Sequence, residues 1–475
     1  MRKAIAALLA LLCLCGTASF TFADASHATA RCRFTCSTQG AKFDNVLQMS
    51  NASYIKLDAK GWFALDWTDP ISVVWWQWNE LPTDYIVKER DANGETLRET
   101  ACSDAQIMCS WRVGEDVCGL LVQVAAPSSL CALRAYTKEQ AEQANFLFAP
   151  VAEKTELMVL SAHPDDEFVM FGGLLPLYAG EQGRTTTVVY LANGAIQRHR
   201  ETLRGLWTAG VKTYPIFLGY TDALPTAREE QLKHFGGMDF VVGNLVALLR
   251  QYRPEVVVAH AEDGEYGHGA HIVASEAMRL AVTAAADPNQ YPDSAAAFGV
   301  WQVKKLYLHL YAENGLTLDD TAPLAAFGGK TAMQVATDSF SFHRSQREGW
   351  GKVMRARTYD GAQYGLYAST VGADTGANDL FEHIDEANHT PAPTDTPAPT
   401  DTPAPTDAPT PTDAPAIVDV AKETPPDAPA PQPTHGTDVL RLPPKSTPVW
   451  PWLLGGGMLL GLAAFLIVLA IRKRR

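Results

Sequence analysis

Two clusters of histidine and carboxylate residues could bind a metal ion. The first is HPDDE, His163–Glu167, at the end of the stretch Leu160–Glu167 that directly follows the apolar run Glu156–Val159. Neighbouring carboxylates repel one another and are costly to bury without a positive partner. The second cluster, His260–His271, contains three histidines and three carboxylates. Together the two clusters predict a divalent cation bound between them.

Within the second cluster the histidines have different expected positions. His268 and His271 are three residues apart near the predicted start of a helix, so both can face the same point. His260 directly follows a strand-like run, and we expect it to support the strand end rather than to bind metal.

A mixed set of histidine and carboxylate ligands suits zinc with an open coordination position, in which three protein ligands leave the fourth place to water. Such a metal lowers the pKa of its water and polarises a substrate carbonyl. An unligated carboxylate beside it can accept the proton of the water, and a histidine opposite can donate one to a leaving amine. These residue types therefore predict hydrolysis of an amide or an ester.

The segments that would position these residues alternate between strand and helix over residues 150–385. Apolar, strand-like runs occupy residues 156–162, 185–192, 214–219, 255–260 and 304–311. Helix-like segments occupy residues 168–180, 197–209, 238–252 and 271–285. This order predicts an α/β fold, a Rossmann-like and mostly parallel sheet flanked by helices on both faces. Functional residues of such sheets collect at the carboxyl ends of the strands, where both clusters lie.

The ordered motifs resemble the PIG-L/LmbE-type family over about residues 155–385. The motifs are AHPDDE (Ala162–Glu167), RHRE (Arg198–Glu201), FLGYTD (Phe217–Asp222), YGHGAH (Tyr266–His271) and HRSQ (His343–Gln346). Members of that family are metal-dependent N-deacetylases that act on N-acetylglucosamine-containing compounds. The resemblance implies a zinc-dependent deacetylase of an N-acetylated amino sugar, with another divalent transition metal as the alternative to zinc.

Carried over by position, the resemblance implies roles for five residues of the two clusters. His163, Asp166 and His271 would be the zinc ligands. Asp165 would be the general base that activates water. His268 would be the general acid, or the cation that stabilises the tetrahedral oxyanion.

The resemblance also implies which residues surround the metal. Arg200 and Asp222 match positions that contact the sugar in relatives, and Arg198 is the alternative to Arg200. Glu167 is expected to support the site through hydrogen bonds. His343 is expected to order the C-terminal part of the fold rather than to contact substrate.

One motif departs from the pattern of the family. The usual second motif is H-P-D-H, whereas residues 268–271 are His-Gly-Ala-His, with Ala270 in place of the aspartate. That aspartate would orient a histidine and raise its basicity. Either Glu262, Asp263 or Glu265 replaces it, or turnover is lowered.

Residues 32–140 have the composition of a separate β domain. They contain the six cysteines that remain after residue 23 and no histidine between the first and the last of them. The six are Cys32, Cys36, Cys102, Cys109, Cys118 and Cys131. We therefore expect a disulfide-rich, β-sandwich-like domain rather than a zinc site. Asp91–Gly94 is a predicted hairpin turn, and Trp75, Trp76 and Trp78 are expected to fill the core rather than to stack on sugars.

The two ends of the sequence predict export and anchoring. Residues 1–23 have the pattern of a signal peptide. Residues 390–447 are rich in Pro, Thr and Asp and predict an extended stalk. Residues 450–471 form an uncharged apolar run that reaches roughly 33 Å as a helix, enough for a transmembrane span, and residues 472–475 are a basic cytoplasmic tail. The expected location is a cell membrane, crossed once, with the folded domains outside.

The net charge of the chain and its expected location indicate which classes of partner it binds. A formal net charge of −14 argues against nucleic acid as a partner. Export points to an N-acetylated cell-wall, capsule or environmental glycan as substrate. The alternative is a non-catalytic or weakly active glycan-binding surface protein with a deacetylase-like domain. An intact Asp165 favours the enzyme, Ala270 keeps the alternative open, and hydrolysis of a different amide is a third hypothesis.

Overall fold

The computed structural model describes residues 26–48, 52–103, 106–192, 194–222 and 227–384. The predicted signal peptide, stalk, transmembrane helix and basic tail lie outside these residues. Among the described helices, none is by itself long and apolar enough to cross a membrane. Two consecutive helices, Arg228–His234 and Met238–Tyr252, meet the criterion as a pair bent by 65°.

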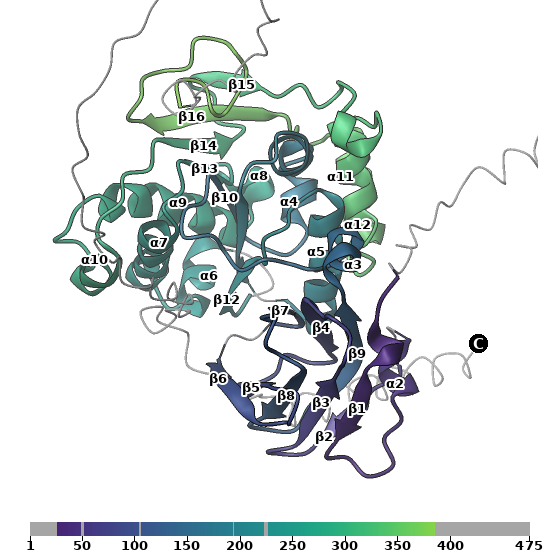
Figure 1. Cartoon of the computed structure of the whole chain (residues 1–475). Coiled ribbons are helices and arrows are strands. Elements are labelled where there is room, and N and C mark those ends of the chain that lie inside the picture. The colour runs from purple at the N-terminus through teal and green to yellow at the C-terminus, as the bar shows by residue number, and fades with distance from the viewer. Residues whose placement is uncertain (1–25, 49–51, 104–105, 193, 223–226, 385–475) are drawn as a thin grey trace, which may run out of the picture.

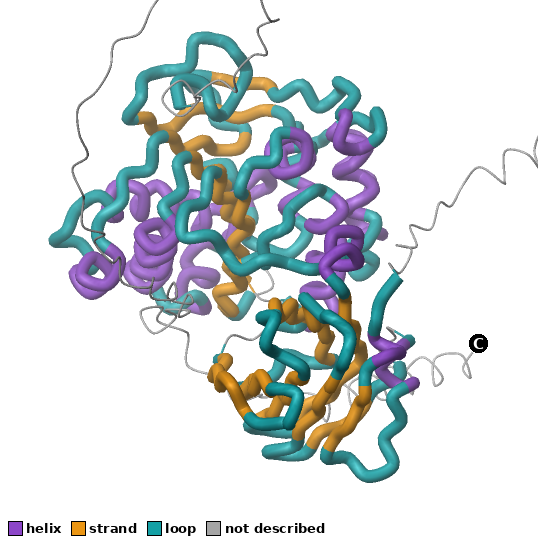
Figure 2. The backbone as a smooth tube through the Cα atoms, viewed as in Figure 1, coloured by secondary structure: helices purple, strands orange, loops and turns teal. Residues whose placement is uncertain are grey.

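The N-terminal part of the chain forms two antiparallel sheets that share one core, which we call the β unit (Figures 1 and 2). The strand orders are β1-β3-β8-β5-β6 and β2-β9-β4-β7. Its strands are β1 (Arg33–Cys36), β2 (Ile55–Leu57), β3 (Trp62–Asp66), β4 (Val73–Trp78), β5 (Tyr85–Arg90), β6 (Thr96–Cys102), β7 (Met108–Arg112), β8 (Gly119–Val124) and β9 (Ser128–Tyr136). Its helices are η1 (Thr29–Arg31), α2 (Asp44–Leu47) and α3 (Lys138–Gln143).

Two local predictions for the β unit are confirmed. Trp75, Trp76 and Trp78 are at most 1% exposed, so they belong to the core and are closed to sugars. Asp91 starts the turn between β5 and β6, and its carboxylate accepts hydrogen bonds from the backbone N–H groups of Asn93 and Glu95. Burial of large aromatic side chains therefore stabilises this unit.

The predicted disulfides are not confirmed. No disulfide bond joins any two of the six cysteines in the described part of the chain. Two of the cysteines in paired strands lie opposite aromatic residues rather than another cysteine. Cys36 lies opposite Phe63, and Cys109 lies opposite Trp76.

The rest of the described chain confirms the mixed α/β prediction and forms what we call the α/β unit. Its seven-stranded sheet has the order β12-β11-β10-β13-β14-β16-β15, and the first five strands are parallel. The strands are β10 (Leu157–Ser161), β11 (Thr186–Ala192), β12 (Ile216–Tyr220), β13 (Val256–Ala259), β14 (Lys305–His309), β15 (Gly315–Thr317) and β16 (Gln363–Ser369).

Helices cover both faces of this sheet (Figure 1). They are α4 (Asp166–Val169), the π-helical η2 (Pro176–Glu181), α5 (Ile196–Thr208), α6 (Arg228–His234), α7 (Met238–Tyr252), α8 (Gly264–Gly267), α9 (Gly269–Ala285), α10 (Pro292–Phe298), η3 (Ala325–Phe327), α11 (Ala332–Phe340) and α12 (Arg347–Ala356). Leu245 of α7 and Ala274 of α9 pack on one face, and Leu206 of α5 and Phe340 of α11 pack on the other.

The predicted helix over residues 168–180 is wrong as a continuous element. The chain forms α4, a turn and then η2. Gly172 interrupts the helix with a φ of +53°, and its backbone packs directly against Gly361. Helix α4, in which the first cluster ends, therefore has only one turn. The predicted helix over residues 238–252 coincides with α7.

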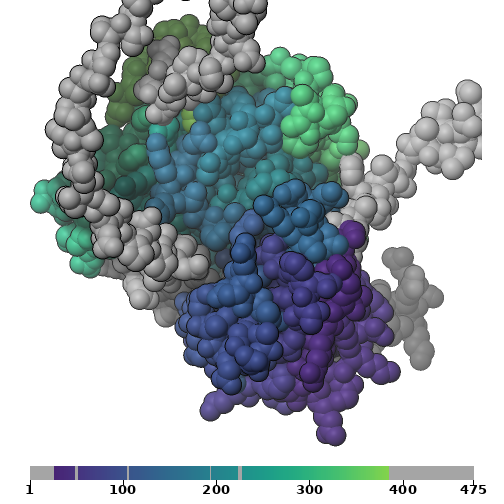
Figure 3. Space-filling model, in the orientation of Figure 1, coloured from purple at the N-terminus to yellow at the C-terminus, as the bar shows by residue number. Residues whose placement is uncertain are grey.

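The β unit packs against one end of the α/β unit, as a lobe of its own (Figure 3). Leu203 and Tyr214 of the α/β unit are buried within the core of the β unit. The Tyr214 hydroxyl accepts a hydrogen bond from the N–H of Ile107, at 2.9 Å. Trp207 donates to the side chain of Asn145 at 3.1 Å. Helix α5 therefore contacts both units.

Candidate metal centre

The two predicted clusters follow two neighbouring parallel strands. The first cluster comes directly after β10 and the second directly after β13, and Val159 of β10 lies opposite Val258 of β13. Because parallel strands end at the same edge of the sheet, both clusters lie at its carboxyl edge.

The three predicted metal ligands lie together there. One ligand atom from each of His163, Asp166 and His271 lies within 4.8 Å of the other two, and all three residues are buried. Oδ2 of Asp166 is 3.0 Å from Nδ1 of His163 and 3.2 Å from Nε2 of His271. Burial opposes the charge of Asp166, but the two imidazoles outweigh it and lower the pKa of this carboxyl well below its usual value. Asp166 is therefore a carboxylate ready to bind a cation.

The donor set fits a divalent metal. Nε2 of His163 and Nε2 of His271 are buried and have no hydrogen-bond partner among the described residues. Each faces a carboxylate, Asp222 at 3.4 Å from Nε2 of His163 and Asp166 at 3.2 Å from Nε2 of His271, an arrangement that a bound cation would complete. Two imidazole nitrogens and one carboxylate oxygen are the ligands of a catalytic zinc site with an open position.

Glu265 positions the second cluster. Its carboxylate accepts hydrogen bonds from Nδ1 of His271 at 2.7 Å, of His260 at 3.1 Å and of His309 at 2.9 Å. A carboxylate at this position performs the orienting role of the aspartate that Ala270 replaces. Of the three acidic residues considered from the sequence, Glu265 is the one in contact with His271.

His260 is not available as a ligand. Its Nε2 accepts a hydrogen bond from the N–H of Ala162 at 2.9 Å, while Nδ1 contacts Glu265. Both nitrogens are used, so His260 ties the end of β13 to the end of β10, as expected from the sequence. The grouping of His260, Glu265 and His271, although also compact, is satisfied by its own hydrogen bonds.

Asp165 lies next to the ligands in a strained conformation. Its φ is +134°, a rare value for a residue with a side chain. Its backbone N–H donates to Oε2 of Glu167 at 2.6 Å, and Oε1 of Glu167 is 3.1 Å from Nε2 of His343. Glu167 and His343 therefore fix the loop, as expected for Glu167.

The carboxylate of Asp165 is buried and accepts a hydrogen bond from Arg198. Burial raises the pKa of Asp165 to about 7, against the opposing charge of Arg198. A carboxyl with a raised pKa beside a metal site has the properties of a general base.

His268 faces the ligands from the start of α9. Its ring lies 4.8 Å from the rings of both His163 and His271. Nδ1 accepts a hydrogen bond from the N–H of Ala270 at 3.2 Å, which caps the helix and leaves the proton on Nε2. Burial, followed by the charges of His271 and His163, lowers the pKa of His268 to about 4. The side chain is therefore a neutral donor.

Of the two predicted substrate-binding residues, Asp222 lies beside the candidate metal ligands and Arg200 does not. Oδ2 of Asp222 is 3.4 Å from Nε2 of His163. Arg200 instead donates from Nη2 to the carbonyl oxygen of Asn79 in the β unit. Arg198, the alternative considered from the sequence, contacts Asp165 and donates to the carbonyl oxygen of Pro164 at 2.5 Å.

Two residues of the site, His309 and Tyr266, had no role assigned from the sequence. His309 lies within an apolar strand, and only the structure shows that it contacts Glu265. Tyr266 is 39% exposed and packs against His268, Trp350 and Tyr359 with ring distances of 5.4, 5.1 and 5.9 Å. It places an aromatic surface at the rim of the site.

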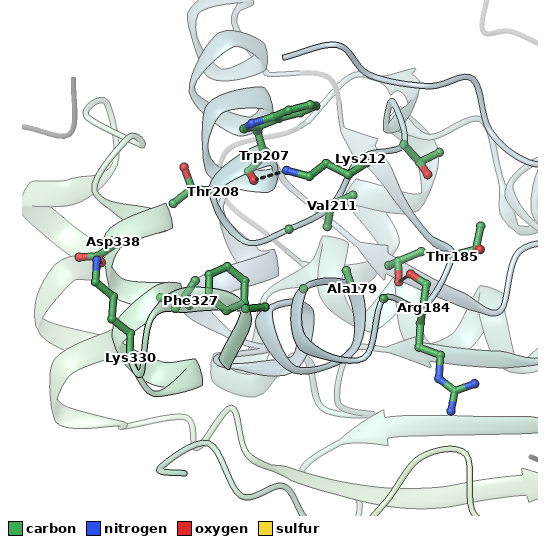
Figure 4. A pocket seen from close by; sticks show the side chains of 17 residues that line it. Ala179, Arg184, Thr185, Trp207, Thr208, Val211, Lys212, Phe327, Lys330 and Asp338 are labelled. Atoms are coloured by element: carbon green, nitrogen blue, oxygen red, sulfur yellow. Dashed lines mark hydrogen bonds and ion pairs between the residues drawn. The ribbon is translucent and has the colours of Figure 1, made fainter. Parts of the chain in front are cut away.

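A separate cavity of about 690 Å³ lies at the opposite edge of the sheet, near the start of β11 and the end of α5 (Figure 4). Trp207 and Phe327 contribute its aromatic surfaces. Lys330 pairs with Asp338 at 2.9 Å, and Lys212 donates to the carbonyl oxygen of Trp207 at 3.3 Å. Its described lining residues include no cluster of metal ligands, so the chemistry belongs to the carboxyl edge.

One segment of the α/β unit matches the model of the family that the motifs resemble. Residues 158–282 match the family described as PIG-L: GlcNAc-PI de-N-acetylase. The matched segment contains both clusters and all the predicted ligands.

Similar proteins include two curated deacetylases. The chain is 30% identical over 178 residues to the 1D-myo-inositol 2-acetamido-2-deoxy-alpha-D-glucopyranoside deacetylase of Geodermatophilus obscurus, which covers 32% of this chain and 60% of that protein. It is 26% identical over 281 residues to a protein of the same name from Catenulispora acidiphila, which covers 50% of this chain and 85% of that protein. The chain thus spans less than two thirds of the length of the Geodermatophilus protein.

Among solved structures, the N,N'-diacetylchitobiose deacetylase of Pyrococcus horikoshii is similar at 18% identity. It has a TM-score of 0.35, with 48% of this chain and 86% of that chain covered.

Proposed function

We propose that this protein is a metal-dependent hydrolase that removes the acetyl group from an N-acetylglucosamine-containing glycan or glycoconjugate. The observation that carries this proposal is the buried set of His163, Asp166 and His271, in which Nε2 of each imidazole makes no hydrogen bond within the described chain and faces a carboxylate. The PIG-L domain and the names of the similar deacetylases support the same reaction class.

Zinc is the cation that this donor set suits best. His163, Asp166 and His271 would bind it. When bound, it would supply an activated water and polarise the carbonyl of the acetamide.

The other side chains perform the proton transfers. Asp165 accepts the proton of the attacking water, and Arg198 keeps its carboxylate in place. Nε2–H of His268 donates a hydrogen bond to the oxygen on which negative charge develops, and the proton that Asp165 took from the water passes to the leaving amine. Asp222, at the carboxyl edge of the sheet, accepts hydrogen bonds from sugar hydroxyls. The aromatic ring of Tyr266 packs against the sugar ring.

The location is part of the same proposal. The apolar run 450–471, the Pro-rich segment 390–447 and the leader-like residues 1–23 support a membrane-tethered enzyme whose folded units lie outside the cell. A cell-wall or capsule glycan would then be within its reach.

The test is acetate release from N-acetylglucosamine oligomers by the full chain. We expect Asp165→Asn to lower the rate about 10²–10⁴-fold while the bound metal is retained. If the metal-loaded wild type releases no acetate from any N-acyl sugar tested, the glycan-binding alternative replaces the enzyme.

A further inference from the structure

The cavity at the edge of the sheet opposite the metal ligands is bounded by two aromatic side chains. Trp207 and Phe327 are both half-buried, and they lie on opposite sides of the space in Figure 4. The segment with Phe327 is held in place, because the carboxylate of Glu181 accepts hydrogen bonds from the N–H groups of Ala325 and Ala326 at 3.0 and 2.8 Å. The volume of about 690 Å³ is within the range of sites that bind ligands.

The charges along the cavity are mostly positive. Three cations and one carboxylate line it. Arg184 and Lys330 each pair with a carboxylate, at 3.0 and 2.9 Å. The ammonium group of Lys212 lies 3.7 Å from the centre of the Trp207 ring, and within the described residues no carboxylate pairs with it. The cavity therefore combines aromatic surface with positive charge, in a chain whose net charge is −14.

The last described residues of the chain lie beside this cavity. Tyr178 of η2 donates a hydrogen bond to the carboxylate of Asp379 at 3.0 Å, and η2 itself contributes to the lining. The guanidinium group of Arg184, a lining residue, lies 4.2 Å from the centre of the Phe381 ring. The sequence that follows residue 384 therefore starts next to the cavity.

Beyond the described residues, the predicted stalk begins with Pro- and Asp-rich repeats. Residues 391–414 read PAPTDT twice, then PAPTDA and PTPTDA. Each repeat has an aspartate at the same position, and none has a lysine or an arginine. Such a sequence favours the polyproline II conformation, in which the aspartates recur on one side at intervals of roughly 19 Å. Pro-rich segments of this kind bind in grooves lined by aromatic side chains, so the repeats match the cavity in conformation and in charge.

We propose that the cavity binds the first two repeats of the same chain, residues 391–402. The two aromatic side chains contact the prolines, and Lys212 pairs with an aspartate. Pro391 is seven residues after Ile384, a distance of at most roughly 23 Å. So short a connection gives an effective concentration in the millimolar range, and individually weak contacts therefore suffice. Each docked repeat shortens the free stalk by roughly 19 Å. The docking does not depend on the reaction at the metal centre.

Proteolysis of the full chain in detergent tests this docking. The protease Asp-N cleaves before aspartate, and mass spectrometry follows each cut. Asp395 and Asp401 are the test sites, and Asp427 and Asp438 are the reference sites. A synthetic peptide of residues 388–440 gives the rates for the free sequence. We expect cleavage at the test sites to be about fivefold or more slower than in the peptide, because only the undocked fraction is cut. Cleavage at the reference sites should equal that of the peptide.

Variants of the lining connect the protection to the cavity. Lys212→Gln removes an exposed cation, and Phe327→Ala removes one aromatic wall. We expect each to raise cleavage at the test sites about twofold or more. Lys233→Gln is the matched control and should leave the rates unchanged, because Lys233 is an exposed lysine of α6 outside the lining. Far-UV circular dichroism checks the fold of each variant.

The outcomes decide the inference. Protection of the test sites that either lining variant lowers, at constant rates in the control, supports docking in the cavity. Test sites that are cut in the wild type as fast as in the peptide overturn it, and so does protection that neither lining variant changes. Protection that disappears on dilution assigns the repeats to the cavity of a second copy and overturns docking within one chain.

Discussion

At the scale of single residues, the carboxylate of Glu265 accepts hydrogen bonds from three imidazoles, those of His260, His271 and His309. Because Nδ1 of His271 donates to it, Nε2 of His271 is the nitrogen that can bind a metal after losing its proton. Glu265 itself has a φ of +62°, a strained value that the surrounding hydrogen bonds must compensate.

Replacing Glu265 with glutamine should therefore weaken metal binding. An amide lacks the charge that makes His271 a strong donor, so we expect metal affinity to fall about 10–100-fold. Competition with a chromophoric chelator measures this. Glu262→Gln is the matched control, since Glu262 is exposed and pairs with Arg279; equal losses in both variants would refute the positioning role of Glu265.

The sequence predicted the three candidate ligands that the structure brings together, but not all of their neighbours. His163, Asp166 and His271 follow from the motif and from the position of each cluster after a strand. The choice between Arg198 and Arg200 depends on the rotation of α5, which is set by its packing between two units. Which of the three acidic residues contacts His271 depends on the path of α8. This segment is short and irregular, and its backbone departs from helical values.

At the scale of elements, Gly172 limits the length of α4, the one-turn helix in which the first cluster ends. It has a φ of +53°, and a Cβ there would lie 3.1 Å from the backbone of Gly361. The sequence predicted strands β10–β14 because each is a continuous run of apolar residues. It did not predict the interruption at Gly172, nor the antiparallel strand β16, because both depend on contacts between residues far apart in the chain.

Gly172→Ala should destabilise the protein more than Gly183→Ala. Gly183 also has a positive φ, +68°, but open space around it, so alanine there costs about 1–2 kcal/mol in backbone strain alone. At Gly172 crowding should add about 1–3 kcal/mol. Urea unfolding of both variants measures the difference, and equal losses would show that the approach of Gly361 adds nothing.

At the scale of the whole molecule, the two units share buried side chains. Leu203 is fully buried within the core of the β unit although it belongs to α5. The domain division predicted from cysteines and strand patterns contained no sign of this contact, because α5 is amphipathic like any helix that covers a sheet.

Leu203→Ala should destabilise both units together, by about 2–5 kcal/mol. Leu280→Ala is the control, because Leu280 is 48% exposed and its truncation should cost within about 0.5 kcal/mol. Urea unfolding followed by tryptophan fluorescence, which reports mainly on the β unit, and by far-UV circular dichroism should give one coincident transition. Two separate transitions, with only one shifted by the variant, would mean that the units are independent.

The metal content of the purified full chain tests the central claim most directly. The account predicts about one transition-metal ion per chain, zinc in particular, in the wild type and in Asp165→Asn, and its loss in His163→Ala and His271→Ala. A wild type that binds no such ion after reconstitution, or a His271→Ala variant that binds it as tightly as the wild type, would contradict the account.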